Sequence, residues 1–394
     1  MRQNGGNASR FLALRNFECS PSIAALLLVL LISMVTPLWS QNAATPTFEE
    51  IEKQAAEARD SHRLEEASAL YREGLKLRPG WSEGSWYLGS SLYGLKRYGE
   101  ARDAFRHVAI SQPGNGPAWA LSGMCEFELK NYPRALEYLT RAESTNLGGN
   151  EELNSLVHLR IALLENREGA FEQAYVHLIP IVATGTYPEV IEALGLTILR
   201  TPLLPSEIPE HDRDLYQRAG EALYDTLTHD KEGAARIFEE LVTSYPNRPN
   251  VHNARGAFLV DSDPGEAMKE FERELEISPS DSNALFRLTS LSLKQGNPEK
   301  AVDYARRFVK SSPTAVAAHR LLGEALLQSG GVAGAIAELQ SAVKQEPDFA
   351  QTHFLLAEAY KRAGNKLLAS KEMAEFQRLD RKQKHDFSNA NLPQ

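Results

Sequence analysis

Histidine is the residue whose spacing in this chain most suggests chemistry. The chain has ten histidines, and two of them, His319 and His353, occupy equivalent places in successive segments of the chain. Because neutral imidazole is a common ligand of divalent metals, histidines stacked at equivalent places could bind an ion. Trp119 occupies the equivalent position of an earlier segment. A shared position that accepts both Trp and His favours a packing role, so the sequence predicts neither a metal site nor a cofactor.

The two cysteines predict a chain without an internal disulfide. Cys19 lies within the N-terminal segment that we expect to be removed on export, which leaves Cys125 alone in the mature chain. Stability must then come from packing. Cys125 follows Gly123 by two residues on a predicted helix, where small residues pack, and this favours a buried thiol over a reactive one.

Several common catalytic motifs are absent from the chain. It lacks His-Glu-x-x-His, the phosphate-binding Gly-x-x-x-x-Gly-Lys-Ser/Thr and Cys-x-x-Cys. The net charge is -9, and no block of Lys and Arg interrupts the acidic balance, which argues against binding to nucleic-acid phosphates. We therefore predict a protein that is not an enzyme and does not bind nucleic acid.

Prolines recur along the chain with a period of about 34 residues, a length typical of structural repeats. The series is Pro79, Pro113, Pro246, Pro279, Pro313 and Pro347. Three neighbouring pairs of these prolines are 34 residues apart, and Pro246 and Pro279 are 33 residues apart. An alanine lies twelve residues before each of them, at Ala67, Ala101, Ala234, Ala267, Ala301 and Ala335. An apolar residue lies eight residues before each, at Tyr71, Phe105, Phe238, Phe271, Ala305 and Leu339. Such agreement predicts an array of structural repeats.

Each position of the repeat has a physical role in a pair of antiparallel helices. Small residues let the two backbones approach, and on the first helix they are Gly89, Gly123, Gly323 and Ala357. Proline ends the second helix because it disfavours helical geometry in the preceding residue. The turn within each pair is expected at residues 96–98, 130–132, 295–297, 329–331 and 363–365, where Gly or Asn accepts left-handed geometry.

This pattern resembles the tetratricopeptide repeat (TPR) family. The clearest matches are Leu88-Gly89 with Ala101, Phe105 and Pro113, and Leu322-Gly323 with Ala335 and Pro347. The resemblance covers Phe48 to about Arg381. It implies an all-α fold, a right-handed superhelical α-solenoid of helix-turn-helix repeats. As evidence of function it is weaker, because TPR arrays serve many processes.

The repeats divide the chain into predicted regions. We expect an N-terminal TPR block at residues 48–187, an irregular helix and Pro-rich connector at 188–210, a C-terminal TPR block at 211–381 and a polar tail at 382–394. Three prolines between Thr201 and Pro209 exclude regular helix there. The connector could be a hinge or a packed insert, and its leucines and isoleucine favour the insert.

Residues 1–40 have the order of a secretory signal peptide. Arg2, Arg10 and Arg15 precede an uncharged run of about 13 residues, and Ser40 offers a small residue for cleavage. The run is shorter than the roughly 20 residues that span a bilayer. The alternative is an uncleaved anchor, which would be the only membrane contact. Either way we expect an exported protein, periplasmic or extracellular, with the membrane-anchored form as the alternative.

The resemblance also implies a concave working surface lined by the first helix of each pair. Carried onto this chain, the partner-binding residues are expected to be Trp86, Tyr93, Met124, Phe127, Phe286, Arg320 and Phe354. The alternative is that these side chains only pack against neighbouring helices. The Asn and Lys set that clamps a carboxyl terminus in chaperone-binding relatives is not visible.

The function that the resemblance implies is a non-catalytic scaffold or adaptor for protein or peptide partners. Export places that role outside the cytoplasm, in the assembly of an envelope or secretion complex. An alternative of a different class is an accessory subunit that binds a glycan or a polysaccharide-processing enzyme, since concave aromatic side chains could stack on sugar rings.

Overall fold

The computed structural model describes residues 46–145, 147–184 and 188–390, with side chains as far as residue 384. Throughout this part of the chain the regular structure is helical and no strand occurs, which confirms the all-α prediction. The predicted signal segment, residues 1–40, lies outside the described residues. Among the helices that the structure describes, none combines the length and apolar character needed to cross a bilayer.

The helices follow one another along the chain with short connections. The first ten are α2 (Phe48–Asp60), α3 (Leu64–Leu77), α4 (Ser82–Gly94), α5 (Tyr98–Ser111), α6 (Gly116–Glu128), α7 (Tyr132–Glu143), α8 (Glu151–Arg167), α9 (Phe171–Val182), α10 (Pro188–Ile198) and α11 (Arg213–Leu227). The others are α12 (Lys231–Ser244), α13 (Val251–Leu259), α14 (Pro264–Ile277), α15 (Ser282–Lys294), α16 (Pro298–Ser311), α17 (Val316–Gln328), α18 (Val332–Gln345), α19 (Ala350–Arg362) and α20 (Lys366–Ala390).

The chain divides into two compact units between Gly80 and Trp81. In the described part of the first unit, α2 packs on α3. Thr47 and Glu50 form a capping box at the start of α2, which satisfies backbone N–H groups that the helix leaves free. Arg78 pairs with Glu49 at 2.7 Å and its guanidinium lies 3.7 Å from the centre of the Phe48 ring, which ties the end of the pair back to its start.

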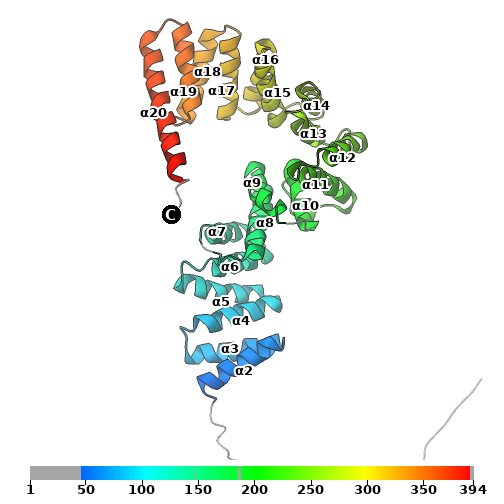
Figure 1. Cartoon of the computed structure of the whole chain (residues 1–394), viewed down its shortest axis with the longest axis vertical. Coiled ribbons are helices and arrows are strands. Elements are labelled where there is room, and N and C mark those ends of the chain that lie inside the picture. The colour runs from blue at the N-terminus through cyan, green and yellow to red at the C-terminus, as the bar shows by residue number, and fades with distance from the viewer. Residues whose placement is uncertain (1–45, 146, 185–187, 391–394) are drawn as a thin grey trace, which may run out of the picture. The chain divides into compact units, whose positions relative to one another are not determined.

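In the second unit each helix packs on the one that follows it (Figure 1). The small residues of the repeat are needed for this approach. A Cβ atom on Gly89 would lie 2.8 Å from the Phe105 ring, and one on Gly323 would lie 2.5 Å from Leu339. The glycines and the bulky residues eight positions before the prolines are therefore complementary parts of one contact, as the repeat predicted.

The turns within the pairs differ in part from the expectation. Gly296, Gly330 and Gly364 have positive φ, as predicted for glycine. In the two earlier turns the left-handed residue is lysine, with φ of 58° at Lys96 and 59° at Lys130, and not the Asn131 that the sequence suggested. These lysines adopt a conformation that costs L-residues about 1–2 kcal/mol, and the surrounding helix pair must hold it.

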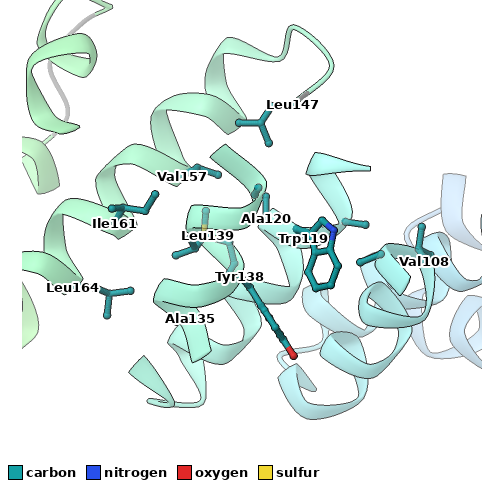
Figure 2. Packing of buried hydrophobic residues seen from close by; sticks show 14 residues of the cluster. Val108, Trp119, Ala120, Ala135, Tyr138, Leu139, Leu147, Val157, Ile161 and Leu164 are labelled. Atoms are coloured by element: carbon teal, nitrogen blue, oxygen red, sulfur yellow. The ribbon is translucent and has the colours of Figure 1, made fainter. Parts of the chain in front are cut away.

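A recurrent hydrogen bond links four of the first helices to the preceding proline turn. Trp119 donates its indole N–H to the carbonyl of Pro113 at 3.2 Å, inside the hydrophobic cluster of Figure 2. His319 and His353 make the same bond through Nε2, at 2.9 Å each, to the carbonyls of Pro313 and Pro347. His252 does so with Pro246 at 3.0 Å. The four residues form what we call the proline clamp.

The second ring nitrogen of each clamp histidine is also occupied. Nδ1 lies 2.6–2.7 Å from a carboxylate on the second helix of the pair, in His252–Glu270, His319–Glu338 and His353–Glu372. Trp119 instead contacts the ring of Tyr138, at a centroid distance of 5.4 Å. Because both nitrogens of His319 and His353 serve these bonds, the packing interpretation of the pair is confirmed and neither offers a free metal ligand.

The middle of the unit departs from the repeat. A Cβ on Gly195 of α10 would lie 1.9 Å from the backbone oxygen of Tyr216, and one on Gly220 of α11 would lie 1.9 Å from that of Ile191. The two helices therefore touch backbone to backbone. In the segment that follows α10, Leu204 is 3% exposed and is buried in a hydrophobic cluster, so residues 199–208 pack onto the unit.

Further contacts hold this insert in place. A short 3-10 turn, Pro205–Glu207, positions the Glu207 carboxylate beside Arg167 of α8 at 2.5 Å. Asn166, fully buried, donates to the Thr197 hydroxyl at 2.9 Å and so joins α8 to α10. At the other end of the chain α20 continues to Ala390, so the predicted polar tail is helical as far as that residue.

Candidate partner-binding groove

A cavity of about 360 Å³ opens in the middle of the second unit. Its lining comes from α9, α10, α11, α12, α13 and α15, and it lies where the repeat pattern is least regular. We call it the central groove and define it by its lining residues Phe171, Glu172, Tyr175, Thr197, Ile198, Arg200, Leu223, Thr226, Phe238, Asn253, Ala254, Ala257, Phe258, Asn283 and Arg287.

Aromatic side chains form the walls of the central groove. Phe238 and Phe258 stack with ring centroids 5.1 Å apart, and Phe238 is 1% exposed, so the deeper ring supports the outer one. Phe171 lies on α9 with the guanidinium of Arg200 4.9 Å from its ring centre. Tyr175 is one helical turn further along α9. Large apolar surfaces held rigidly in this way suit an apolar side chain of a ligand.

Two polar atoms in the lining are unsatisfied. Asn253 is 2% exposed, and its amide nitrogen donates to Asn250 at 3.1 Å and to Asp281 at 2.9 Å. Its Oδ1 is buried and has no hydrogen-bond partner among the described residues. Nε of Arg287 is also buried and has no hydrogen-bond partner among the described residues. Buried polar atoms are nearly always paired, so this acceptor and this donor require an explanation.

The central groove is locally positive although the whole chain carries a net charge of -9. Its charged lining residues are two arginines and one glutamate. Arg200 pairs with Glu172 at 2.7 Å. Burial raises the pKa of Glu172, but the hydrogen bond and charge of Arg200, with a smaller effect of the Arg287 charge, lower the pKa overall. Glu172 stays ionised and neutralises Arg200, which leaves the charge of Arg287 uncompensated within the lining.

The residues that the sequence assigned to a working surface lie elsewhere. Trp86 packs edge-to-face on Phe105 at 5.5 Å, Tyr93 on Tyr98 at 5.3 Å, and Phe127 on Tyr132 at 5.8 Å. All three predicted residues are half-buried and contact one hydrophobic cluster.

Arg160 lies beside two of the N-terminal aromatics, Phe127 and Tyr93. Its guanidinium lies 4.9 Å from the centre of the Phe127 ring and its charge acts on Tyr93. Burial, aided by the charge of Glu128, raises the pKa of Tyr93 to about 12. Met124 is only 6% exposed and is part of the core, so it has little surface for a partner.

The C-terminal members of the predicted surface are also half-buried. Phe286 contacts Phe308 at 6.4 Å and Phe354 contacts Phe376 at 5.4 Å. Arg320 lies 3.8 Å from Glu324 and over the Phe349 ring at 5.7 Å. None of the three lines the central groove.

The sequence contained one signal for the groove that our prediction missed. Asn253 precedes Gly256 by three residues, just as Trp86 precedes Gly89 and Arg320 precedes Gly323. It therefore occupies the predicted working-surface position of its repeat. Arg287 has no such marker, because it lies two residues before Thr289, which replaces glycine in that repeat.

Cys125 behaves as the sequence predicted. The side chain is fully buried, and burial raises the pKa of its thiol to about 12. Since the thiolate is the reactive form, a thiol that stays protonated at neutral pH is inert.

Comparison with solved structures finds partial similarity to helical repeat proteins. MamA from Desulfovibrio magneticus RS-1 is 22% identical, and the match covers 42% of this chain and 94% of that chain with a TM-score of 0.40. YrrB, described as a TPR protein with an unusual peptide-binding site, is 17% identical over 43% of this chain and 89% of that chain, with a TM-score of 0.38. No curated protein sequence matches this chain.

Family models match directly in the sequence. One tetratricopeptide repeat model matches residues 53–116, 290–348 and 325–381, and a second matches residues 214–248. These segments lie on both sides of the irregular middle and coincide with the helix pairs of the structure. The chain belongs to the tetratricopeptide repeat family.

Proposed function

We propose that this protein is a non-catalytic scaffold that binds an extended peptide segment of a partner protein in the central groove. The observation that carries the proposal is the unsatisfied pair in its lining, the Asn253 Oδ1 acceptor and the Arg287 Nε donor. A peptide backbone supplies one donor and one acceptor per residue and so complements both atoms. Recognition of this kind depends little on the side chains of the ligand.

The walls of the groove add the selectivity. An apolar side chain of the peptide would lie between Phe171, Tyr175 and Phe258, and the cavity of about 360 Å³ has room for one large side chain with its backbone. The uncompensated charge of Arg287 favours an acidic residue or a terminal carboxylate beside it, because arginine binds carboxylates through paired hydrogen bonds. The expected motif is an apolar residue next to an acidic one.

The place of action is proposed from the N-terminal segment. Its basic start and short apolar run are those of an export signal, so we propose that the scaffold acts in the periplasm or outside the cell, in assembly of an envelope or secretion complex. The half-buried residues Trp86, Tyr93 and Phe127 remain a proposed second surface for a partner.

Peptide selection tests the proposal. A random peptide library displayed on phage is panned on the chain, and the affinity of the selected peptides is measured for an Asn253→Leu/Arg287→Leu variant. Loss of hydrogen bonds to a charged group costs about 1.5–3 kcal/mol, which corresponds to a roughly 10- to 150-fold weaker affinity. The matched control is Arg320→Leu, which removes an arginine from a first helix outside the groove and leaves the affinity unchanged.

The same selection separates the two surfaces. Peptides whose affinity is lost only in a Trp86→Ala/Tyr93→Ala/Phe127→Ala variant would place binding on the N-terminal aromatics and contradict the central groove. Selected peptides that bind every variant equally would contradict both surfaces. A glycan array serves the alternative function: saturable binding to glycan without any peptide ligand would favour the glycan-binding accessory subunit.

A further inference from the structure

Two histidines and a glutamate come together on the successive helices α7, α8 and α9. Glu143 is the last residue of α7, His158 lies in α8 and His177 lies in α9. Each offers one ligand atom, and these atoms all lie within 4.8 Å of one another. Oε1 of Glu143 is 3.4 Å from Nδ1 of His158 and 3.2 Å from Nε2 of His177. The centroids of the two imidazole rings are 5.6 Å apart.

The proton on His177 is placed by its neighbours. Nδ1 lies 2.8 Å from Oε2 of Glu165 and 3.1 Å from the backbone oxygen of Gln173. Both neighbours are acceptors, so Nδ1 must carry a hydrogen. In the neutral ring Nε2 then has a lone pair, and this lone pair faces the carboxylate of Glu143. Two electron-rich atoms at 3.2 Å repel each other unless a proton or a cation lies between them.

His158 adds a second atom in need of a partner. Its Nδ1 is buried and makes no hydrogen bond with any described residue, although the Glu143 carboxylate is 3.4 Å away. An imidazole nitrogen without a hydrogen-bond partner, 3.4 Å from a carboxylate oxygen, is a ligand atom available to a metal.

We propose that Glu143, His158 and His177 bind a divalent transition metal ion of the zinc class. Ligand atoms 2.0–2.2 Å from a tetrahedral ion lie about 3.3–3.6 Å from each other, and the two Glu143 distances are close to that range. The Glu165 carboxylate holds the His177 ring and its tautomer, as outer carboxylates do for zinc-bound histidines. A set of two imidazoles and one carboxylate suits zinc better than magnesium or calcium, which prefer oxygen ligands.

Three protein ligands leave a fourth tetrahedral position open. The side chains of Glu143, His158 and His177 are 31%, 17% and 19% exposed, so solvent or a ligand atom of a partner reaches that position. The ion would join the end of α7 to the middle of α8 and the middle of α9 directly. It would therefore stiffen α9, which forms part of the lining of the central groove, without occupying the groove itself.

The proline clamps provide an internal comparison. His158 and His177 have the same separation in sequence as His319 and Glu338. In the clamp a histidine on the first helix forms a hydrogen bond with a carboxylate on the second helix. Here a histidine faces a histidine instead, and the neighbouring carboxylates of Glu143 and Glu165 supply the negative charge. Replacement of the carboxylate by an imidazole turns a hydrogen-bonded pair into a potential chelate.

Titration of the full chain with zinc at pH 7.5, followed by calorimetry, tests the site, and cobalt serves as a spectroscopic probe of tetrahedral geometry. We expect one bound equivalent, an affinity lowered at least about 100-fold in His158→Gln and in His177→Gln, and a decrease of about 10- to 100-fold in Glu165→Gln. The matched control His319→Gln removes a histidine from a His–Glu pair and keeps the site, so it binds zinc as the unchanged chain does.

Absence of saturable zinc binding, or equal affinity in His158→Gln, His177→Gln and the unchanged chain, would overturn the proposal. The cluster would then be a metal-free ion pair with a protonated His177. Circular dichroism checks that each variant keeps its helical content. Should a histidine variant fail to fold, Glu143→Gln decides, because the glutamate is partly exposed at a helix end: weaker zinc binding supports the site, and unchanged binding contradicts it.

Discussion

The repeats before and after the middle of the second unit place different residues at the same structural positions. In α4–α7 the clamp residue is Trp119 and the turn residues are Lys96 and Lys130. In α15–α20 the clamps are His319 and His353, and the turns contain glycine. The hydrogen bond to the proline carbonyl and the left-handed turn are common to both. The repeat therefore fixes the backbone geometry and leaves the chemistry of each position open.

The irregular middle follows neither version. There α10 and α11 meet at Gly195 and Gly220 without side chains between their backbones. The central groove opens beside this crossing, and α9, α10, α11, α12, α13 and α15 form its lining. The proposed binding site thus lies where the regular contact of the repeat is broken.

The largest expected effect concerns the contrast between the two kinds of glycine. Gly195→Ala directs a methyl group at a backbone oxygen 1.9 Å away, which neither helix can avoid without moving. Gly323→Ala directs it at the flexible side chain of Leu339. We expect Gly195→Ala to lower the free energy of unfolding by about 3 kcal/mol or more, and Gly323→Ala by about 1–3 kcal/mol. Urea unfolding measures both, and equal losses would show that the α10–α11 crossing is not special.

The second prediction tests the tryptophan clamp. Trp119→Ala removes a buried indole, its hydrogen bond to Pro113 and its contact with Tyr138. Truncation of a large buried side chain costs about 3–5 kcal/mol. Trp119→His should recover part of the loss, because its Nε2 can donate to the same carbonyl. No difference between the Ala and His variants in urea unfolding would mean that the clamp bond contributes nothing.

The third prediction separates the two regions by pH. Burial lowers the pKa of His252 and His319, but the hydrogen bonds to Glu270 and Glu338 outweigh it, so both pKa values are raised. Glu274 adds to the effect at His252, while Arg255 shares the Glu270 carboxylate. A histidine whose pKa is raised in the folded state stabilises that state. The contribution is fully present below the pKa of the unfolded chain, about 6.5, and is lost as the pH rises through the pKa of the folded chain.

The free energy of unfolding should therefore fall as the pH rises above about 6.5. His252→Gln and His319→Gln variants should show a smaller fall, because they remove the titrating groups. Urea unfolding at a series of pH values from 6 to 9 provides the measurement. A slope that is the same in the unchanged chain and in a double variant would contradict the role of these histidines.

The smallest expected effect lies in the turns. Lys96→Gly and Lys130→Gly relieve a left-handed lysine, which should stabilise the chain by about 0.5–1 kcal/mol each, net of the greater freedom of glycine in the unfolded chain. Gly296→Ala is the reverse change at φ 71° and should destabilise by a similar amount. Thermal unfolding detects shifts of this size, and a loss of stability in the two lysine variants would contradict the comparison.

Much of the fold could be predicted from the sequence because the repeat shows which residues share a position. The prolines, the alanines twelve residues before them and the glycines of the first helix defined the pairs. The equivalence of His319, His353 and Trp119 was also enough to assign a packing role. These inferences succeed because each depends on local geometry that recurs once in every repeat.

The sites could not be predicted in the same way. Asn253 and Arg287 lie on α13 and α15 and line one cavity together with residues of α9 to α12, and no local spacing in the sequence records that arrangement. Glu143, His158 and His177 come from three successive helices, and only the separation of the two histidines recurs elsewhere in the chain. The aromatic residues at Trp86 and Phe127 drew attention because of their type, whereas the groove depends on unsatisfied polar atoms that only a structure reveals.

Amide hydrogen exchange with and without a selected peptide tests the central claim most directly. Binding in the central groove should slow exchange in α9, α10, α13 and α15, and the protection should disappear in Asn253→Leu/Arg287→Leu. Protection confined to α4–α7, around Trp86 and Phe127, would contradict the claim and return the binding surface to the N-terminal repeats.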